Sequence, residues 1–484
     1  MSALCLSVFV TCSAPQVAEQ ESIAPEAAAA EGKDGGPSEA QVEERVEVKE
    51  DEGPAASAER LSTEIVATET VATEKEERLR VEARGVWVTR WDFSSAEDIQ
   101  GIMVGAKGAG FNQVYFQVRG VADAYYRSGV EPWAAPLTGK LGRDPGWDPL
   151  AVAIEAAHGQ GMELHAWINT CTAWKGKVPP GPSTPTHILR SHPEYRVADK
   201  RGRPMSYSNG HYIFLNPALP GVQRHLEAVV ADLASFYAID GLHLDYARYP
   251  AHETSNDRLG RRLFAKARKA EPGLDRATWQ RRQLSKLIKR LRAKVHEVRP
   301  RAMVSAAVTG IYRDLWGWDG VTQGFVDFHQ DSHGWAEQGA VDALIPMIYW
   351  PPTTKPGART DFVTLAEHFA PLGAKVTLLA GLNVEAGDFE VLRREVAIAR
   401  EKGFDGFVLF AWASLVKRGW LERLGREIFV GPALPRPPER LSRLRRRLSD
   451  WTKRWARAEG SSTAQGLLWM TALRSMTTSS IQFR

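Results

Sequence analysis

The segment Gly241-Leu-His-Leu-Asp245 places glycine, histidine and aspartate on one face and two leucines on the other. This alternation predicts a buried strand that ends in a reactive carboxylate. Seven more apolar runs of similar length occur on either side of it. The eight runs are Gly85–Thr89, Gln113–Val118, Glu163–Ile168, Gly241–Asp245, Met303–Val308, Asp342–Tyr349, Lys375–Ala380 and Gly406–Ala411.

Segments of helical length and amphipathic pattern lie between these runs. They are Ala96–Ala109, Leu150–Gln160, Val222–Tyr237, Thr278–Val298, Phe362–Phe369 and Phe389–Lys402. Strands that alternate with helices over about 350 residues predict an α/β protein of the (β/α)8 TIM barrel class. An open doubly wound sheet is the alternative, but no GxGxxG turn follows any of the runs.

The composition of the 484 residues permits a large core, with 43% hydrophobic residues and 16 Trp. No apolar run approaches the roughly 18 residues that a membrane-spanning helix needs. Only three Cys are present, which excludes a disulfide scaffold and a Cys-rich zinc module. We expect four regions: a signal-like apolar segment (1–12), an acidic disordered tether (13–80), the barrel (81–430) and a basic, weakly ordered extension (431–484).

The two chain ends differ in charge from the barrel. Residues 13–78 contain 18 Asp and Glu against 6 Lys and Arg, and few large apolar residues. Such a segment buries too little surface to offset its ordering entropy. The preceding stretch Met1–Cys12 is apolar and ends in a cysteine, as bacterial lipoprotein signals do, or is an ordinary secretory fragment. We therefore expect export to the periplasm or outer-membrane-associated cell envelope, with Cys12 as the lipidation site.

Polar side chains recur at the last inward position of several predicted strands. In this fold the active site lies where the strands end, and the interior layers need only branched apolar residues. The predicted registers therefore place six side chains at one mouth: Arg119, Asn169, Asp245, Tyr349, Asn383 and Trp412. His165 and Trp167 share the parity of Asn169, and His243 shares that of Asp245. Aromatic faces can stack on sugar rings, while the polar groups can bond hydroxyls.

Several stretches resemble the glycosyl hydrolase-like 10 family of bacterial barrel proteins, which includes envelope lipoproteins. They are Arg84-Gly-Val-Trp-Val-Thr, Phe116-Gln-Val-Arg119-Gly, Asp123-Ala-Tyr-Tyr, Leu164-His-Ala-Trp-Ile-Asn169, Asp240-Gly-Leu-His-Leu-Asp245-Tyr, Arg248-Tyr-Pro and Pro346-Met-Ile-Tyr349. The resemblance implies a TIM barrel that acts on a glycan, and at least one member cleaves peptidoglycan strands that lack stem peptides. Many members carry a second Asp where Tyr246 stands, which weakens a mechanism with adjacent carboxylates here.

Glycosidic cleavage usually needs two carboxyl groups that flank the bond. Asp245 is the first candidate, and its partner is Asp123, Asp331 or Glu385, each near a strand end. Asp123 is slightly favoured, because its loop also carries the resemblance. The other mouth candidates are assigned to substrate binding: Arg119, His165, Trp167, Asn169, His243, Tyr349, Asn383 and Trp412.

The leading interpretation is a glycoside hydrolase with a polysaccharide substrate, most simply peptidoglycan strands, and with no cofactor and no nucleic-acid partner. A metal-dependent polysaccharide deacetylase is one alternative, because His243 and Asp245 have ligand spacing on one face. The sequence contains no HExxH motif, so no metal site is assigned. A barrel that binds glycans without cutting them is the other alternative. The buried-looking Cys171 has no pattern of a catalytic thiol around it.

The apolar start predicts that the protein works outside the cytoplasm. Metabolic labelling with a radioactive fatty acid should modify the full chain, and Cys12→Ser should abolish the label. Export without labelling would indicate an ordinary secretory signal. Recovery of the native protein only from the cytosolic fraction would contradict the prediction.

Overall fold

Eight parallel strands form a closed barrel, and each strand falls on one of the eight apolar runs. The computed structural model describes residues 80–251, 254–318, 320–353 and 360–435. Around the barrel the order is β10-β11-β2-β3-β4-β7-β8-β9, and β9 pairs with β10. The strands are β2 Ala83–Val88, β3 Gln113–Arg119, β4 Glu163–Asn169, β7 Gly241–Asp245, β8 Met303–Thr309, β9 Ala343–Met347, β10 Thr377–Asn383 and β11 Gly406–Phe410. The predicted TIM barrel is confirmed.

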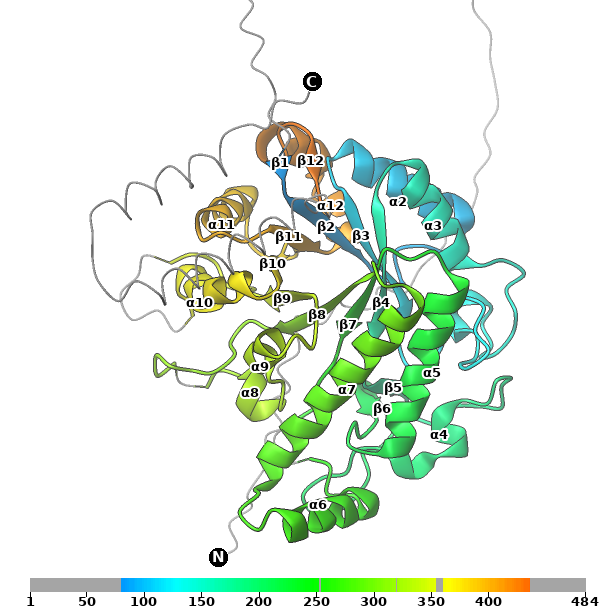
Figure 1. Ribbon diagram of the computed structural model, residues 1–484. Helices are drawn as coiled ribbons and strands as arrows, with labels where there is room; N and C mark the ends of the chain where they lie inside the picture. The colour runs from blue at the N-terminus through cyan, green and yellow to red at the C-terminus, as the bar shows by residue number, and fades with distance from the viewer. Residues whose placement is uncertain (1–79, 252–253, 319, 354–359, 436–484) are drawn as a thin grey trace, which may run out of the picture. The chain divides into compact units, whose positions relative to one another are not determined.

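Helices surround the strands (Figure 1), and each of the six predicted helical segments overlaps one of them. The helices are α2 Ala96–Gly108, α3 Pro149–Gly159, α4 Ile188–Ser191, α5 Pro220–Phe236, α6 Arg258–Ala270, α7 Arg276–Val298, α8 Gly324–Asp327, α9 Ser332–Glu337, α10 Phe362–Phe369, α11 Phe389–Glu401, α12 Trp412–Lys417 and α13 Leu421–Arg423. Many begin after a Ser or Asp that accepts a first-turn N–H, which is the preferred N-cap chemistry. These caps are Ser95, Asp148, Asp257, Asp275, Asp331, Asp361 and Asp388.

Aromatic rings fill much of the barrel interior, where branched aliphatic residues are more usual. The ring of Tyr115 stacks on that of His165 with centroids 4.7 Å apart. The indole N–H of Trp87 donates to Nε2 of His243 at 3.0 Å. Nδ1 of His243 must then carry the proton, and it lies 2.9 Å from the hydroxyl of Ser305. Burial, with His165 nearby, holds the pKa of His243 well below its usual range, so this imidazole is neutral.

Two strand glycines make room for these rings. A Cβ added at Gly241 would lie 2.1 Å from Nδ1 of His165, which stands beside it across the β4–β7 pair. A Cβ at Gly85 would lie 2.7 Å from the ring of Tyr115. Glycine weakens a strand in isolation. Here the packing of a large ring on its bare backbone explains why it is present.

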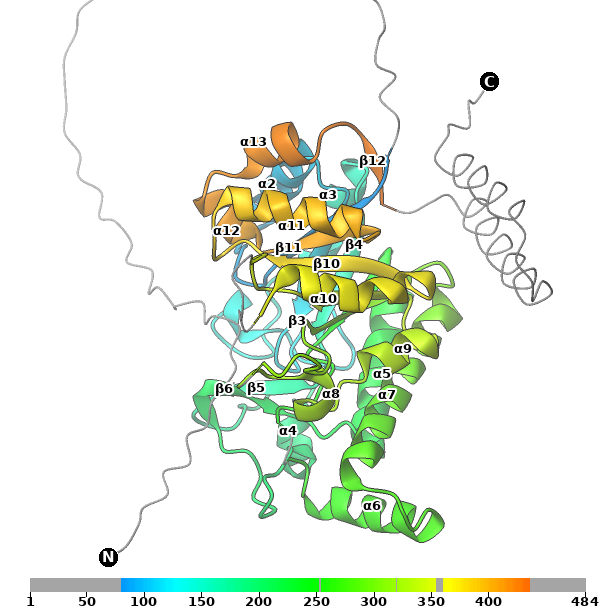
Figure 2. The ribbon, with the colours of Figure 1, turned by 90° about the vertical axis from the view of Figure 1, so that its left-hand side faces the viewer.

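The segment after β4 forms a hairpin that was not predicted. Strands β5 Thr172–Gly176 and β6 Ser208–Phe214 pair in antiparallel fashion. Figure 2 shows that this hairpin and α8 both project beyond the same end of the barrel. They follow β4 and β8, so this is the C-terminal end of the strands. The long excursion after β4 is therefore an ordered wall of the mouth.

The ends of the described chain meet, because β1 Arg80–Val81 pairs in parallel with β12 Ala433–Leu434. The predicted signal segment with Cys12, the acidic tether and most of the basic extension lie outside the described residues. Within the residues that the structure describes, no helix is both long and apolar enough to cross a bilayer. Cys171 is a buried free thiol, and burial raises its pKa to about 12.

The packing against Gly241 generates a stability prediction. Gly241→Ala should lower the free energy of unfolding by about 1–3 kcal/mol, as overpacking of a tight interior usually does. The matched control is Gly101→Ala in α2, where an added Cβ has no neighbour within 4 Å. That change should stabilise the protein by roughly 0.5–1 kcal/mol. Denaturant titration measures both, and equal effects of the two substitutions would contradict this account of the interior.

Candidate active site

The ends of the strands bring together four of the six side chains expected at the mouth. Asn169 and Asp245 occupy paired positions at the ends of β4 and β7. Asn383 ends β10, and its side-chain oxygen accepts the backbone N–H of Glu385 at 2.8 Å. Tyr349 follows β9, and the charges of both Asp245 and Glu385 act on its phenol. Its pKa is raised well above the usual range, chiefly by burial, so the phenol stays protonated and can donate a hydrogen bond.

Asp245 sits at a strained point of the backbone. Its carboxylate accepts the N–H of Tyr246 at 2.6 Å. Tyr246 has a φ of 46°, a left-handed conformation that is uncommon for a bulky residue and that clusters at functional sites. Burial raises the pKa of Asp245, while Arg248, the Tyr246 N–H and the indole of Trp167 offset part of this rise.

Two more carboxyl groups with perturbed acidity, Glu385 and Asp92, lie near each other. Burial raises the pKa of Glu385, and Arg418 opposes the rise. Asp92 lies between β2 and α2 and accepts the Thr89 N–H at 2.6 Å. Burial raises the pKa of Asp92 to about 6 despite this hydrogen bond, and the charge of Glu385 contributes to the rise. Asp245, Glu385 and Asp92 are thus three carboxyl groups that retain a proton to higher pH than usual.

A separate set of neighbours of Asp245 combines aromatic rings with guanidinium groups. The hydroxyl of Tyr212, on β6, accepts a hydrogen bond from Arg90 at 3.0 Å. The rings of Tyr212 and Tyr246 meet edge to face with centroids 5.5 Å apart. The guanidinium of Arg248 lies 4.8 Å from the centre of the Tyr246 ring. This part of the mouth offers flat apolar faces and positive charge together.

Arg119 does not reach the open mouth, contrary to the prediction. The β3–β4 register shifts between Gln117 and Arg119, and the bulge breaks the expected alternation of side chains. The guanidinium is fully buried and binds Glu131 through two hydrogen bonds of 2.7 and 2.9 Å. It also donates to the carbonyl oxygens of Asn169 and Thr172. All of this indicates a structural role.

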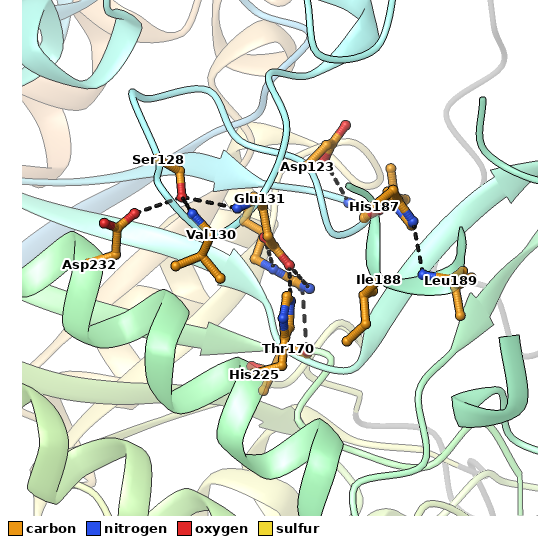
Figure 3. Close-up of polar contacts among 12 residues, drawn as sticks. Asp123, Ser128, Val130, Glu131, Thr170, His187, Ile188, Leu189, His225 and Asp232 are labelled. Carbon is orange, nitrogen blue, oxygen red and sulfur yellow. Dashed lines mark hydrogen bonds and ion pairs between the residues drawn. The ribbon is translucent and has the colours of Figure 1, made fainter. Parts of the chain in front are cut away.

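Figure 3 shows the surroundings of Glu131. His225, on α5, points at this carboxylate, with Nε2 2.7 Å from Oε1. Burial alone would raise the pKa of Glu131, but Arg119 and His225 outweigh it and lower the pKa to about 2. Ser128 lies beside Glu131 and accepts its backbone N–H at 3.2 Å. The Ser128 hydroxyl donates to Asp232 at 2.6 Å. Glu131 therefore stays ionised and acts as the fixed counter-ion of Arg119.

Two of the proposed carboxylate partners of Asp245 form local hydrogen bonds that stabilise their own loops. Asp123 is buried and accepts the backbone N–H groups of Gly120 and Val121 at 3.2 and 2.9 Å (Figure 3). Asp331 caps α9 and accepts the hydroxyl of Tyr312 at 2.8 Å. It lines a groove together with residues of α7. Among the three partners considered, Glu385 is the one that shares a neighbour, Tyr349, with Asp245.

The remaining predicted binding residues lie deeper or elsewhere. His165 and His243 are fully buried in the barrel interior, and Trp167 lines the same interior next to Asp245. Trp412 begins α12, where strand alternation no longer applies, and its ring packs on Gly105 of α2 outside the barrel. Phe410, the last residue of β11, stacks with Tyr349, and their ring centroids lie 6.2 Å apart.

Asp92 and Arg248 were missed as site residues. Asp92 lies beyond the end of β2 in a loop with no recognisable motif. It comes close to Glu385 only when the chain is folded. Arg248 lies within one of the family-like stretches, and that signal could have drawn attention to it. Within the described ranges, no group of three or more His, Cys, Asp or Glu side chains is placed to hold a metal ion.

Comparisons with known proteins agree with the geometry. A family model described as glycosyl hydrolase-like 10 matches residues 82–387. The glycosyl hydrolase DigH of Escherichia coli K12 is 30% identical over 268 residues, which cover 52% of this chain and 57% of DigH. The glycosyl hydrolase YngK of Bacillus subtilis is 28% identical over 251 residues, or 50% of this chain and 46% of YngK. The chain thus spans about half the length of these curated relatives.

Solved structures share the fold at low sequence identity. The PgaB (BpsB) glycoside hydrolase domain from Bordetella bronchiseptica is 17% identical, with a TM-score of 0.52, and covers 71% of this chain and 98% of the domain. The catalytic domain of β-amylase from Paenibacillus polymyxa is 13% identical, with a TM-score of 0.51, and covers 75% and 97%. These likenesses establish the barrel architecture.

The raised pKa of Asp92 generates a prediction about stability and pH. Its pKa of about 6 lies above the ordinary value of 3.8, so the folded state binds the proton more tightly than the unfolded state. The stability that this proton provides is present at low pH and is lost as the pH rises through about 6. Asp92→Asn should therefore raise the thermal midpoint by a few degrees at pH 7.5 and by much less at pH 4. A pH-independent difference would contradict the shifted pKa.

Proposed function

We propose that this chain, which belongs to the glycosyl hydrolase-like 10 family, hydrolyses the O-glycosidic bonds of a polysaccharide. The observation that carries the proposal is the pair Asp245 and Glu385. Both stand beside the protonated phenol of Tyr349 at the C-terminal end of the barrel, and burial raises the pKa of each. Glycoside hydrolysis needs one carboxyl group that keeps its proton and another that does not.

Asp245 is assigned as the ionised member, which acts as nucleophile or base. Arg248, the Tyr246 N–H and the Trp167 indole all favour its charged form against the effect of burial. The proton donor is assigned to Glu385 together with Asp92. These two carboxyl groups interact, so they titrate as a pair, and a pKa of about 6 suits a general acid near neutral pH.

Tyr349 and Asn383 complete the set of groups around the reacting bond. The phenol of Tyr349 retains its proton, so it can donate a hydrogen bond to an anionic oxygen at the reacting centre. Asn383 uses its side-chain oxygen to hold the N–H of Glu385 at 2.8 Å, which leaves its amide N–H groups for the substrate. The rings of Tyr212 and Tyr246 offer stacking faces for the sugar.

We further propose that the polysaccharide is the glycan strand of peptidoglycan, in the cell envelope. The support is the family resemblance and the apolar start that ends at Cys12. Incubation of the full chain with purified peptide-free strands, with other β-linked polysaccharides and with an acetylated polymer separates the three interpretations. New reducing ends indicate hydrolysis, acetate release indicates deacetylation, and binding without either product indicates a glycan-binding barrel.

The assignment of the carboxyl groups generates a kinetic prediction. Asp245→Asn and Glu385→Gln should each lower kcat by about 10²–10⁴-fold, because each removes a proton-transfer or nucleophilic group but keeps its shape. The thermal midpoint should stay within a few degrees or rise, since active-site charges are often destabilising. Reducing-end release and a thermal melt measure the two quantities.

The matched control is Asp388→Asn. Asp388 is exposed three residues beyond Glu385 and caps α11 through its bond to the Val391 N–H, a role that Asn also fulfils. Its turnover should equal that of the wild type. If Asp245→Asn retains wild-type turnover, Asp245 is not the catalytic carboxylate. If the variant unfolds, Asp245 has a structural role instead.

A further inference from the structure

Arg248 presents at the mouth a guanidinium group that stacks on two rings but has no hydrogen-bond or ion-pair partner among the described residues. Its backbone N–H donates to the carbonyl of Tyr246 at 2.8 Å, which fixes its position three residues after Asp245. Its side chain stacks on Tyr246 and, at 4.5 Å, on Phe328. Among the described residues it forms no hydrogen bond or ion pair with a carboxylate, although the charge of Asp245 is close enough to be affected by it.

The other arginines near the site are already occupied. Arg119 is bound to Glu131, and Arg90 donates to the hydroxyl of Tyr212. Arg418 donates to the carbonyl oxygens of Glu385 and Gly387. Arg248 differs because the residue is only partly exposed and yet no described residue accepts a hydrogen bond from its guanidinium. A charge that is partly removed from water without an acceptor is unfavourable unless a ligand supplies one.

We propose that Arg248 binds a carboxylate carried by the substrate, so that the site selects an acidic glycan whose sugar bears a free carboxyl group near the cleaved bond. This rests on the proposed glycoside hydrolase function and specifies its substrate. Arginine presents a planar fork that matches a carboxylate with two parallel hydrogen bonds. Stacking on Tyr246 and Phe328 already holds that fork, so little further ordering is needed on binding.

The position of Arg248 also explains a chemical requirement of the site. Asp245 must remain ionised, and the charge of Arg248 is the strongest of the influences that favour its ionised form. A substrate carboxylate that docks on Arg248 neutralises this cation when the substrate binds. The pKa of Asp245 should then rise in the complex, so acidic substrates should show a kcat profile displaced to higher pH relative to neutral ones.

The test uses one glycan in two forms. Peptide-free strands of peptidoglycan with free lactyl carboxylates are compared with the same strands after carbodiimide coupling to methylamine, which converts each carboxylate to a neutral amide. For the full chain, kcat/KM should be about 10- to 100-fold higher on the acid strand, the range expected for a charge-assisted hydrogen-bonded pair. In Arg248→Gln this ratio should fall close to one, and Arg248→Lys should give an intermediate ratio.

The control is Arg418→Gln, which removes a neighbouring cation whose donors are bound to backbone carbonyls. Its acid-to-amide ratio should match that of the wild type. Both rates are measured on the plateau of the pH profile, where Asp245 is ionised with either strand, so a role of Arg248 in folding or in the acidity of Asp245 alone would leave the ratio unchanged. An unchanged ratio in Arg248→Gln would therefore overturn the proposal.

Binding distinguishes failure of this inference from failure of the proposed function. Calorimetry with the Asp245→Asn variant measures the affinity for both strands without turnover. Tighter binding of the acid strand that is lost on adding Arg248→Gln would support the role of Arg248 even if the wild type cleaved nothing. Equal affinity for the two strands, or no binding of either, would overturn it.

Discussion

The geometry of the mouth depends on the buried ion pair between Arg119 and Glu131. The guanidinium reaches from the end of β3 to the carbonyl oxygens that follow β4, and so joins two neighbouring strands where their sheet pairing ends. The next N–H, that of Thr170, donates to the carbonyl of Asp245 at 2.6 Å. Removing one member of such a buried pair typically costs about 3–5 kcal/mol, because the other charge is left without a partner. The position of Asp245 therefore depends on residues that never meet the substrate.

At the mouth, the acidic and the basic side chains form two separate groups. Asp92 and Glu385 interact with each other, whereas Arg90 and Arg248 accompany the aromatic rings of Tyr212 and Tyr246. Asp245 shares Tyr349 as a neighbour with Glu385, and the charge of Arg248 acts on Asp245 directly. A site of this composition can hold a proton in one part and an anion in another. That combination agrees with the acidic polysaccharide that we propose as substrate, which a uniformly acidic cleft would repel.

The sequence predicted the barrel well, because the period-two pattern of eight strands is a local property. Strand parity also anticipated that Asn169, Asp245 and Asn383 end their strands and that Tyr349 lies near Asp245. Their roles in substrate binding and catalysis stay predictions. Parity failed where the backbone departs from a regular strand. A bulge redirects Arg119, and a helix begins at Trp412. The acidity of Asp92 depends on burial by distant segments, which no local pattern encodes.

The glycines of the barrel interior bear on how this family can diversify. The imidazole of His165 fills the space that a side chain at position 241 would need. The ring of Tyr115 does the same at position 85. A mutation at either member of such a pair leaves a clash or a void, so single-step evolutionary paths cross a less stable intermediate. Exchange of both members together conserves volume. In an alignment of homologues, these positions should therefore covary across adjacent strands as reciprocal small and large residues, independently of any selection on catalysis.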